Sequence, residues 1–328
     1  MKDVVGFGAL NVDLFYEVES LTLFEIGGTR LEAGREIQGS DDDFQGLLGL
    51  LHRHGRFKGK SGGGSAANTI FALARMGFST AFIGKVGGDA EGDFLVRSLE
   101  VGKVDTRWVR RNGRSGMCLI VLDKSQDRFI FLQPNANDTL SRDEIDSALL
   151  SQSRFLHLTS FGGELPMQAQ KAAIEHLPSE GKISFDPGEI YARRGLQEIQ
   201  PFIERCSVLF VTDREVALLT SMDFERGCES LLGYGPDVVV CKRGKKGSFV
   251  LTREGTLRIP IEEVEVVDNT GAGDVYNAGF LAGMMLGKPL EYCALFATRV
   301  SGKSVTGFGR ERYPARGDLI GFFDSVER

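Results

Sequence analysis

Between a β-rich segment and a long apolar helix the chain reads Val267-Asp-Asn-Thr-Gly-Ala-Gly-Asp-Val-Tyr-Asn-Ala-Gly-Phe280. Gly271 and Gly273 let the backbone bend so that successive N–H groups converge, and the following helix adds the positive end of its dipole. Asp274 stands at the same turn, where it can take a proton from a hydroxyl. An anion-binding turn beside a base predicts phosphoryl transfer to an alcohol, although an Asp in a first turn can also simply stabilise the helix.

Composition and charge exclude several classes of protein. The chain has 328 residues, of which 42% are hydrophobic, so it can bury a large core. Its net charge of −6 argues against a nucleic-acid-binding surface, which needs a basic excess. The longest near-apolar run, 278–287, is far shorter than the ~20 residues of a membrane span. The five cysteines show no Cys-x-x-Cys spacing, so we expect a soluble cytoplasmic protein without disulfides.

Strand and helix patterns alternate along most of the chain. Strands are predicted at 4–9, 80–86, 155–158, 182–186, 208–211 and 237–241, hairpins at 117–132 and 248–259, and helices at 65–76, 94–99, 165–176, 196–205, 214–220, 272–286 and 290–304. Repeated β-α units predict a mostly parallel sheet with helices on both faces. Ligands bind such sheets at the carboxyl ends of the strands. Asp13, Asp186, Thr212 and Asp274 follow strands, so we expect them at one edge.

Residues 14–61 interrupt this alternation. They contain short strand patterns at 14–18 and 29–36 and an amphipathic helical pattern at 41–52, which Ser40 can cap. We interpret the strands as a small lid that projects from the core and is joined by part of 104–124. No linker is long enough to divide the chain, which predicts one α/β domain over 1–328 with lid segments at roughly 14–40 and 104–124.

A second glycine cluster, Ser61-Gly-Gly-Gly-Ser-Ala-Ala-Asn68, opens the helix predicted at 65–76. Its small residues allow a ligand to approach the backbone, and the amide of Asn68 can both donate to and accept from a polyol. A flexible hinge before a helix is the alternative that this cluster leaves open by itself.

These motifs, taken in order, resemble those of the ribokinase-like (PfkB) carbohydrate and nucleoside kinases. The likeness begins with Asn11-x-Asp13 and Gly63-Gly64-x-x-x-Asn68, continues with Phe82-Ile-Gly-Lys-Val-Gly-Gly-Asp89-x-x-Gly92, and ends with Asp268-x-Thr-Gly-Ala-Gly-Asp274. It covers nearly the whole chain. It implies a three-layer α/β fold with a mostly parallel central sheet and a small β-lid, ATP with Mg²⁺ as phosphoryl donor, and a small-molecule sugar or nucleoside as acceptor.

The same resemblance implies roles for single residues. Asp274 is expected to be the general base, with an anion hole formed by Gly271, Ala272 and Gly273. The expected acceptor contacts are Asn11, Asp13, Gly63, Gly64 and Asn68. The expected nucleotide contacts are Thr212, Glu215, Lys242, Gly244, Gly247, Ala297 and Ser301, and a monovalent cation is expected near Asp268.

One position departs from the family pattern. After the strand that ends at Val211 the family usually carries Asn-x-x-Glu, whose polar groups arrange magnesium-bound water, whereas this chain reads Thr212-Asp-Arg-Glu215. We therefore expect Glu215 to hold magnesium through water, with a metal dependence changed by Thr212. An ordinary acidic residue at a helix start is the alternative for Glu215.

The acceptor is left open between a sugar and a nucleoside, because the fold does not choose between them. The glycine cluster and the helix at 41–52 resemble the adenosine-kinase-like branch, where Phe15, Leu47, Leu50 and Leu51 could line a base; packing between lid and core explains them equally well. A non-catalytic sensing module is the alternative class, but it predicts loss of the base or the anion hole, and both are retained. Pairing of lid strands in a homodimer also stays open.

Overall fold

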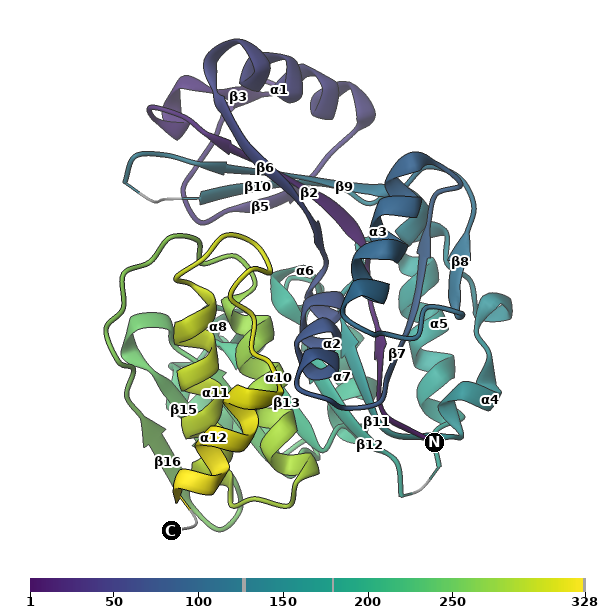
Figure 1. The fold of residues 1–328 in the computed structure, drawn as a ribbon, viewed down its shortest axis with the longest axis vertical. Coiled ribbons are helices and arrows are strands. Elements are labelled where there is room, and N and C mark those ends of the chain that lie inside the picture. The colour runs from purple at the N-terminus through teal and green to yellow at the C-terminus, as the bar shows by residue number, and fades with distance from the viewer. Residues whose placement is uncertain (126–127, 179, 327–328) are drawn as a thin grey trace.

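The computed structural model describes residues 1–125, 128–178 and 180–326, and within them the main body is a nine-stranded sheet with helices on both faces. The strands are β1 (Lys2–Phe7), β7 (Thr80–Val86), β8 (Val109–Arg111), β11 (Ser153–Thr159), β12 (Lys182–Asp186), β13 (Val208–Thr212), β14 (Val238–Lys242), β15 (Ser248–Leu251) and β16 (Thr256–Ile259). Their order is β16-β15-β14-β13-β12-β11-β1-β7-β8 (Figure 1). The pairs β14–β15 and β15–β16 are antiparallel and the other pairs are parallel.

Two groups of helices cover the two faces of this sheet. One group comprises α2 (Ser65–Arg75), α3 (Ala90–Val101), α10 (Ala272–Met285), α11 (Leu290–Ser304) and α12 (Arg316–Val326). The other comprises α4 (Ser147–Leu150), α5 (Glu164–Glu175), α6 (Gly188–Ala192), α7 (Leu196–Arg205), α8 (Asp213–Thr220) and α9 (Phe224–Leu232). Neighbouring residues of β1 point into different cores, Val4 into the first and Val5 into the second. The predicted three-layer, mostly parallel α/β fold is confirmed.

The sequence forms this sheet because its central strands are apolar on both faces. Val4 and Val5 of β1 and Val208 and Leu209 of β13 are all fully buried, as expected for parallel strands between two helix layers. Helix α10 is apolar around most of its circumference because it packs against both α2 and α11. A Cβ at Gly279 would lie 2.7 Å from the Cα of Ala297, so glycine allows α10 and α11 to approach closely.

A second sheet forms the lid above the main body (Figure 1). Its strands, in the order β5-β10-β9-β2-β6, are β5 (Glu36–Gln38), β10 (Arg128–Gln133), β9 (Gly116–Leu122), β2 (Asn11–Glu17) and β6 (Arg56–Gly63), and a two-stranded ribbon is formed by β3 (Glu25–Ile26) and β4 (Thr29–Arg30). Helix α1 (Asp41–His54) packs on the outer face of the lid sheet through Phe44, Leu47 and Leu51. The predicted cap is present, since Ser40 and Asp43 form a capping box at the start of α1.

The lid strands differ from the expected segments 14–40 and 104–124. Strands β6 and β10 also belong to the lid sheet, and β2 begins at Asn11 because it pairs with β6 and β9 from that residue onward. Residues 109–111 instead form β8 of the main sheet, which pairs with β7. The continuous strand expected at 29–36 is interrupted, since Gly34 has a φ of +74° and turns the chain between β4 and β5.

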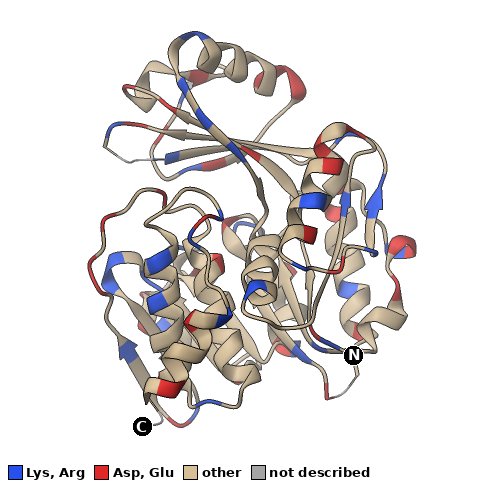
Figure 2. Ribbon diagram, in the orientation of Figure 1, with Lys and Arg blue, Asp and Glu red and all other residues tan. Residues whose placement is uncertain are grey.

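Charged residues of both signs alternate over the lid and the main body (Figure 2). Neither the lid nor the main body is thus covered by charge of a single sign (Figure 2). Within the described part of the chain, no helix has both the length and the apolar character that crossing a membrane would require.

Candidate active site

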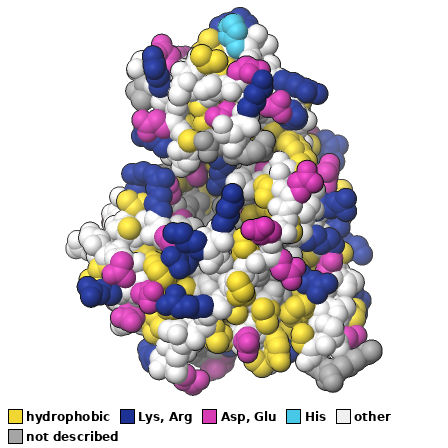
Figure 3. All heavy atoms as spheres, turned by 90° about the vertical axis from the view of Figure 1, so that its left-hand side faces the viewer, with side chains coloured by type: hydrophobic (Ala, Val, Ile, Leu, Met, Phe, Trp, Pro, Cys, Tyr) yellow, Lys and Arg dark blue, Asp and Glu magenta, His cyan; other side chains and the backbone are white. Residues whose placement is uncertain are grey.

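A cavity of about 410 Å³ lies between the lid and the carboxyl ends of the main strands. Figure 3 shows the molecule hollowed where the lid meets the main body, with Lys and Arg side chains around the hollow. Asp13, Asp186, Thr212 and Asp274 all line the cavity, so the strand-end residues meet at one edge as expected. The lid contributes Arg35, Glu36, Cys118, Ile120, Arg128, Ile130 and Leu132 to the opposite wall.

The turn that precedes α10 is built to present backbone N–H groups. Gly271 has a φ of +77°, and no side chain caps the helix that follows. A Cβ at Gly271 would lie 2.3 Å from Oη of Tyr313, which restricts this position to glycine. Gly271 and Gly273 both line the cavity. An uncapped helix start at a cavity wall suits a phosphate group.

Asp268 fixes the start of this turn. Its Oδ1 accepts a hydrogen bond from the N–H of Thr270 at 2.9 Å, and its Oδ2 accepts one from the N–H of Gly309 at 3.0 Å. Asp268 is buried, so these two bonds offset part of the cost of burying its carboxylate. The monovalent cation expected near Asp268 stays a prediction.

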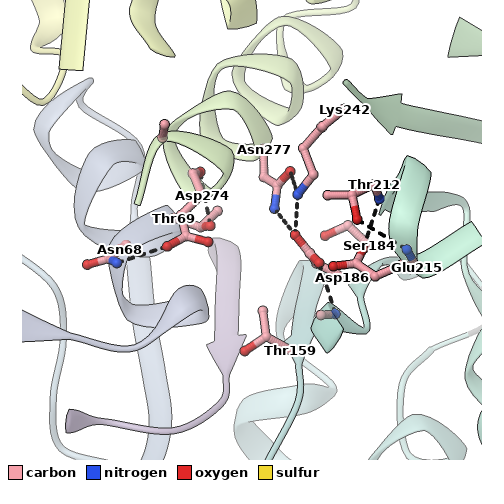
Figure 4. Close-up of polar contacts among 12 residues, drawn as sticks. Asn68, Thr69, Thr159, Ser184, Asp186, Thr212, Glu215, Lys242, Asp274 and Asn277 are labelled. Atoms are coloured by element: carbon pink, nitrogen blue, oxygen red, sulfur yellow. Dashed lines mark hydrogen bonds and ion pairs between the residues drawn. The ribbon is translucent and has the colours of Figure 1, made fainter. Parts of the chain in front are cut away.

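Asp274 lies in the first turn of α10 and is held by helix α2 (Figure 4). Nδ2 of Asn68 donates to Oδ2 of Asp274 at 2.9 Å, and Oγ1 of Thr69 donates to the backbone carbonyl of Asp274 at 3.1 Å. Burial raises the pKa of Asp274 to about 7, although the bond from Asn68 opposes this shift. A carboxylate with such a pKa can act as a base near neutral pH.

Asp13 faces the same cavity from strand β2. Burial raises the pKa of Asp13 to about 8; the charge of Arg310 opposes this shift and the nearby acids Asp268 and Asp274 add to it. A Cβ at Gly63 would lie 2.0 Å from Oδ2 of Asp13, so Gly63 makes room for this carboxylate without lining the cavity itself.

The other predicted acceptor contacts also reach the cavity. Asn11, Gly64 and Asn68 line it. The Nδ2 group of Asn137 donates to Oδ1 of Asn11 at 2.9 Å and to the carbonyl of Leu10 at 2.9 Å, which orients Asn11. This places several hydrogen-bonding groups on the acceptor side of Asp274.

Lys242 and Asp186 line the cavity and form a polar cluster with the buried side chain of Asn277 (Figure 4). Nζ of Lys242 lies 2.5 Å from Oδ2 of Asp186 and 3.2 Å from Oδ1 of Asn277, and Nδ2 of Asn277 donates to Oδ2 of Asp186 at 2.6 Å. Burial acts to raise the pKa of Asp186, but the charge of Lys242 and the hydrogen bonds outweigh it and the pKa is lowered. Lys242 therefore stays a cation within reach of the first turn of α10.

Thr212 and Glu215 form a capping box at the start of α8. The N–H of Thr212 donates to Oε2 of Glu215 at 2.8 Å, and Oγ1 of Thr212 accepts from the N–H of Glu215 at 3.3 Å. Burial and then the charge of Asp186 raise the pKa of Glu215 to about 7. The hydroxyl that replaces the family's asparagine is thus engaged in holding Glu215.

The carboxylates of Asp186 and Glu215 fit a magnesium ion better than a metal with an all-protein shell. Both are buried and line the cavity. The described residues contain no group of three or more His, Cys, Asp or Glu side chains that could hold a metal. Magnesium is usually bound by one or two carboxylates, with water and substrate phosphates completing its shell.

The remaining predicted nucleotide contacts lie away from this cavity. Gly244 and Gly247 flank the turn after β14. Ala297 is fully buried against Gly279, and Oγ of Ser301 donates to the carbonyl of Ala272 at 2.8 Å. None of Gly244, Gly247, Ala297 and Ser301 lines the cavity, and their contact with a nucleotide stays a prediction.

None of the lid-wall residues was predicted from the sequence as a site residue, and two of them, Glu36 and Arg128, interact electrostatically. Nη1 of Arg128 donates to Oδ1 of Asn269 at 3.4 Å, which connects the lid to the turn before α10. Burial raises the pKa of Glu36, and the charge of Arg128 opposes this shift. The sequence could not indicate these two residues, because they are brought together by the parallel pairing of β5 with β10. Such a pairing between distant segments leaves no local sequence pattern.

The residues considered for a nucleobase wall have packing roles. Leu47 and Leu51 are buried between α1 and the outer face of the lid sheet, with Leu50 packed against them. Phe15 contacts Phe308, at 4.5 Å between the ring centroids. None of them lines the cavity, so the packing alternative holds for these residues.

Comparison with known proteins identifies the family. A pfkB family carbohydrate kinase domain matches residues 43–314. The chain belongs to this family. Membership makes this pfkB kinase a phosphotransferase with an alcohol group as acceptor and confirms the resemblance seen in its motifs.

Individual relatives agree with this assignment. The pfkB kinase is 36% identical over 247 residues to an uncharacterized sugar kinase from Archaeoglobus fulgidus, covering 74% of this chain and 98% of that protein. It is 32% identical over 276 residues to an ATP-dependent ribose-1-phosphate kinase from Halopiger xanaduensis, covering 79% of this chain and 90% of that protein. The solved adenosine kinase from Sinorhizobium meliloti has a TM-score of 0.86 at 22% identity, covering 99% of this chain and 98% of that one. This last likeness shows the ribokinase-like fold.

Proposed function

We propose that this pfkB kinase transfers the γ-phosphoryl group of ATP to a primary hydroxyl of a sugar, with Asp274 as the general base. The position of Asp274 carries the proposal: its carboxylate stands at the uncapped start of α10, held by Asn68, in the same cavity as Asp13. A base next to an anion-binding turn suits transfer of a charged group to a hydroxyl.

In the proposed step, the acceptor oxygen attacks the γ-phosphorus and its proton passes to Asp274. The bond between phosphorus and the bridging oxygen breaks, and ADP leaves with that electron pair. The backbone N–H groups of 271–274 would stabilise the charge on the transferred group. With a pKa of about 7, Asp274 is ionised in a large fraction of molecules at neutral pH.

Charge on the phosphates would be balanced from the side of β12–β14. Asp186 and Glu215 would hold magnesium, Glu215 through water, and the bound metal would neutralise phosphate oxygens. Lys242 would add a point charge, because it lines the cavity beside Gly273. The lid wall would exclude water and limit hydrolysis of ATP.

A sugar is the acceptor that the polar side of the cavity supports best. Asp13 can hydrogen-bond to two hydroxyls of a diol, because its carboxyl, with a pKa of about 8, carries both a donor and an acceptor near neutral pH, and Asn11 adds an amide. The relatives named as sugar kinase and ribose-1-phosphate kinase agree with a carbohydrate acceptor. A nucleoside is the second candidate, because Ile120, Ile130 and Leu132 give the lid wall an apolar patch that a base could contact.

The test is ADP release from Mg-ATP over a panel of free sugars, sugar phosphates and nucleosides. The Asp274→Asn variant is the blank, and binding of ATP to both proteins is measured separately. Release stimulated by a sugar or sugar phosphate above the blank supports the proposal. Stimulation by nucleosides alone transfers the assignment to the second candidate. Bound ATP with no stimulation by any acceptor contradicts the kinase mechanism for this panel and favours a sensing module.

A further inference from the structure

Arg310 contacts the residue that holds the proposed base, although it does not line the cavity. It lies between α11 and α12, and its Nε donates to Oδ1 of Asn68 at 3.0 Å. Its guanidinium stands 4.7 Å from the ring centroid of Phe71, and its Nη1 lies 3.5 Å from Oγ of Ser98. No sequence motif had drawn attention to this residue.

We infer that Arg310 is a positioning residue: it fixes the amide of Asn68 and thereby orients the carboxylate of Asp274 for catalysis. This inference rests on the proposed function, because it needs Asp274 to be the base. Arg310 itself is expected to contact neither the acceptor nor the nucleotide, because it does not line the cavity.

The chemistry of the three groups allows one orientation of the amide. A guanidinium only donates hydrogen bonds and a carboxylate only accepts them. Asn68 therefore places Oδ1 toward Arg310 and Nδ2 toward Asp274, as found. A flipped amide would set two donors against each other at Arg310 and two acceptors against each other at Asp274. The flip would replace two charge-assisted hydrogen bonds with two repulsive contacts.

The charge of Arg310 acts in the same direction as its hydrogen bond. Burial raises the pKa of Asp13, and Arg310 is the cation that most opposes that shift. Burial also lowers the pKa of Arg310 itself, and Asp13 and Asp274 act to keep it charged. Other charged or titratable groups that act on these residues are Glu36, Arg128, Asp186, Lys242, Asp268 and Tyr313. Removing Arg310 therefore leaves a cluster of acids with less positive charge and disfavours the ionised base.

The side chain of Arg310 can be changed while its backbone contacts are kept. Nη1 of Arg75 lies 3.5 Å from the carbonyl of Arg310, and the N–H of the preceding Gly309 donates to Asp268. Both contacts use backbone atoms of the loop. A substitution at 310 thus separates positioning of Asn68 from anchoring of the loop.

The experiment compares Arg310→Met, Arg310→Lys and the neighbouring Arg312→Met, using the acceptor identified with the substrate panel. Methionine keeps an apolar stem against Phe71, lysine restores a charged donor, and Arg312 is an exposed arginine of the same loop. Arg310→Met should lower kcat about tenfold to a hundredfold, the range seen when the hydrogen-bond partner of a metal ligand is removed, because Arg310 orients Asn68 in the same indirect way. It should leave the KM for ATP nearly unchanged and move the acid limb of kcat/KM to higher pH. Arg310→Lys should recover part of both effects, and Arg312→Met should behave as wild type.

Wild-type kcat and an unmoved pH profile in Arg310→Met would overturn the inference, and so would a lower melting temperature with no change in the profile. A double-mutant cycle with Asn68→Ala, read in the free energy of unfolding, tests it without turnover. Non-additive effects are expected and additive effects overturn the contact. Because this cycle needs no acceptor, it also decides the contact if the wild type proves inactive. That outcome would contradict the proposed function, and with it the catalytic role of Arg310, while the cycle still reports on the contact with Asn68.

Discussion

Nζ of Lys242 lies 2.5 Å from Oδ2 of Asp186, and this ion pair lines the cavity on the side of β12 and β14. Both residues stand at the carboxyl ends of their strands, β14 and β12, which lie on either side of β13 in the sheet. Glu215 adds a second buried carboxylate, whose pKa burial and Asp186 together raise. Lys242 therefore offsets the charge of two acids at once when no other cation is present.

Replacing Lys242 with methionine should destabilise the protein strongly. The change leaves Asp186 buried without its cation, and removal of one partner of a buried pair typically costs about 3–5 kcal/mol. Denaturant unfolding at neutral pH measures the change, with Lys246→Met on the exposed turn after β14 as the matched control. Equal stability of the two variants would show that Asn277 and solvent suffice to hold Asp186.

Asp274→Asn should abolish most turnover while leaving ATP binding close to wild type. Asparagine keeps an oxygen that accepts from Nδ2 of Asn68, so the local structure is preserved and only the base is removed. Loss of a general base lowers kcat by roughly 10²- to 10⁴-fold. Single-turnover kinetics and ATP titration check the two halves of this prediction. Near-normal kcat in the variant would exclude Asp274 as the base.

The same substitution should change how stability depends on pH. Burial raises the pKa of Asp274 from an ordinary 3.8 to about 7 in the folded protein, so folding favours the protonated form. The raised pKa of Asp274 therefore stabilises the folded protein fully below pH 4, and this stabilisation is lost as the pH rises through 7. Asp274→Asn should therefore be more stable than wild type at pH 8, by up to about 4 kcal/mol, with a smaller gain toward pH 4.

Thermal melts of wild type and Asp274→Asn between pH 4 and 8 measure this difference. The neighbouring acid Asp13 titrates in both proteins, and because the charge of Asp274 adds to the rise in its pKa, part of the pH-dependent difference comes from Asp13. A stability difference that does not vary with pH would mean that the carboxylate of Asp274 is ionised throughout.

The sequence was sufficient for features that have a local pattern. The glycine turn at 271–273, the apolar parallel strands and the Ser40 cap each follow from residues close together in the chain. The motif around Asp89 supported the family resemblance, but its contacts are structural: Asp89 caps α3, which begins at Ala90 and not at the predicted residue 94, and it accepts from Oγ of Ser115 at 2.6 Å. The residues of a motif can thus identify a family without lining the active-site cavity, as Asp89 does here.

The features that could not be predicted from the sequence depend on contacts between residues far apart in the chain. Asn68 was expected to contact the acceptor, and the structure adds its bond to Asp274, 206 positions away. Arg310 reaches Asn68 across 242 positions and follows no pattern at either end. The pairing of β2 with β6 and β9 joins lid segments separated by the whole of α1 or more. Such contacts are set by tertiary packing, which overrides local preference.

Thr212→Asn should change the magnesium dependence of turnover without loss of stability. Asparagine is as good a helix N-cap as threonine, so the bond from the N–H of Glu215 is kept. Its longer amide would reach further into the cavity that Asp186 and Glu215 also line, where it would reorganise water around a bound metal. The magnesium concentration for half-maximal activity is measured at saturating ATP and acceptor.

Thr212→Ala is the matched control, because it removes the cap oxygen and should cost about 0.5–2 kcal/mol of stability. Its magnesium titration reports the effect of a loosened Glu215, since the deleted hydroxyl caps α8 and also hydrogen-bonds to the Glu215 carboxyl. A shift in Thr212→Asn that differs from the shift in Thr212→Ala assigns position 212 to the metal environment. Identical titrations in wild type and Thr212→Asn would place Thr212 outside that environment and leave it as the cap of α8.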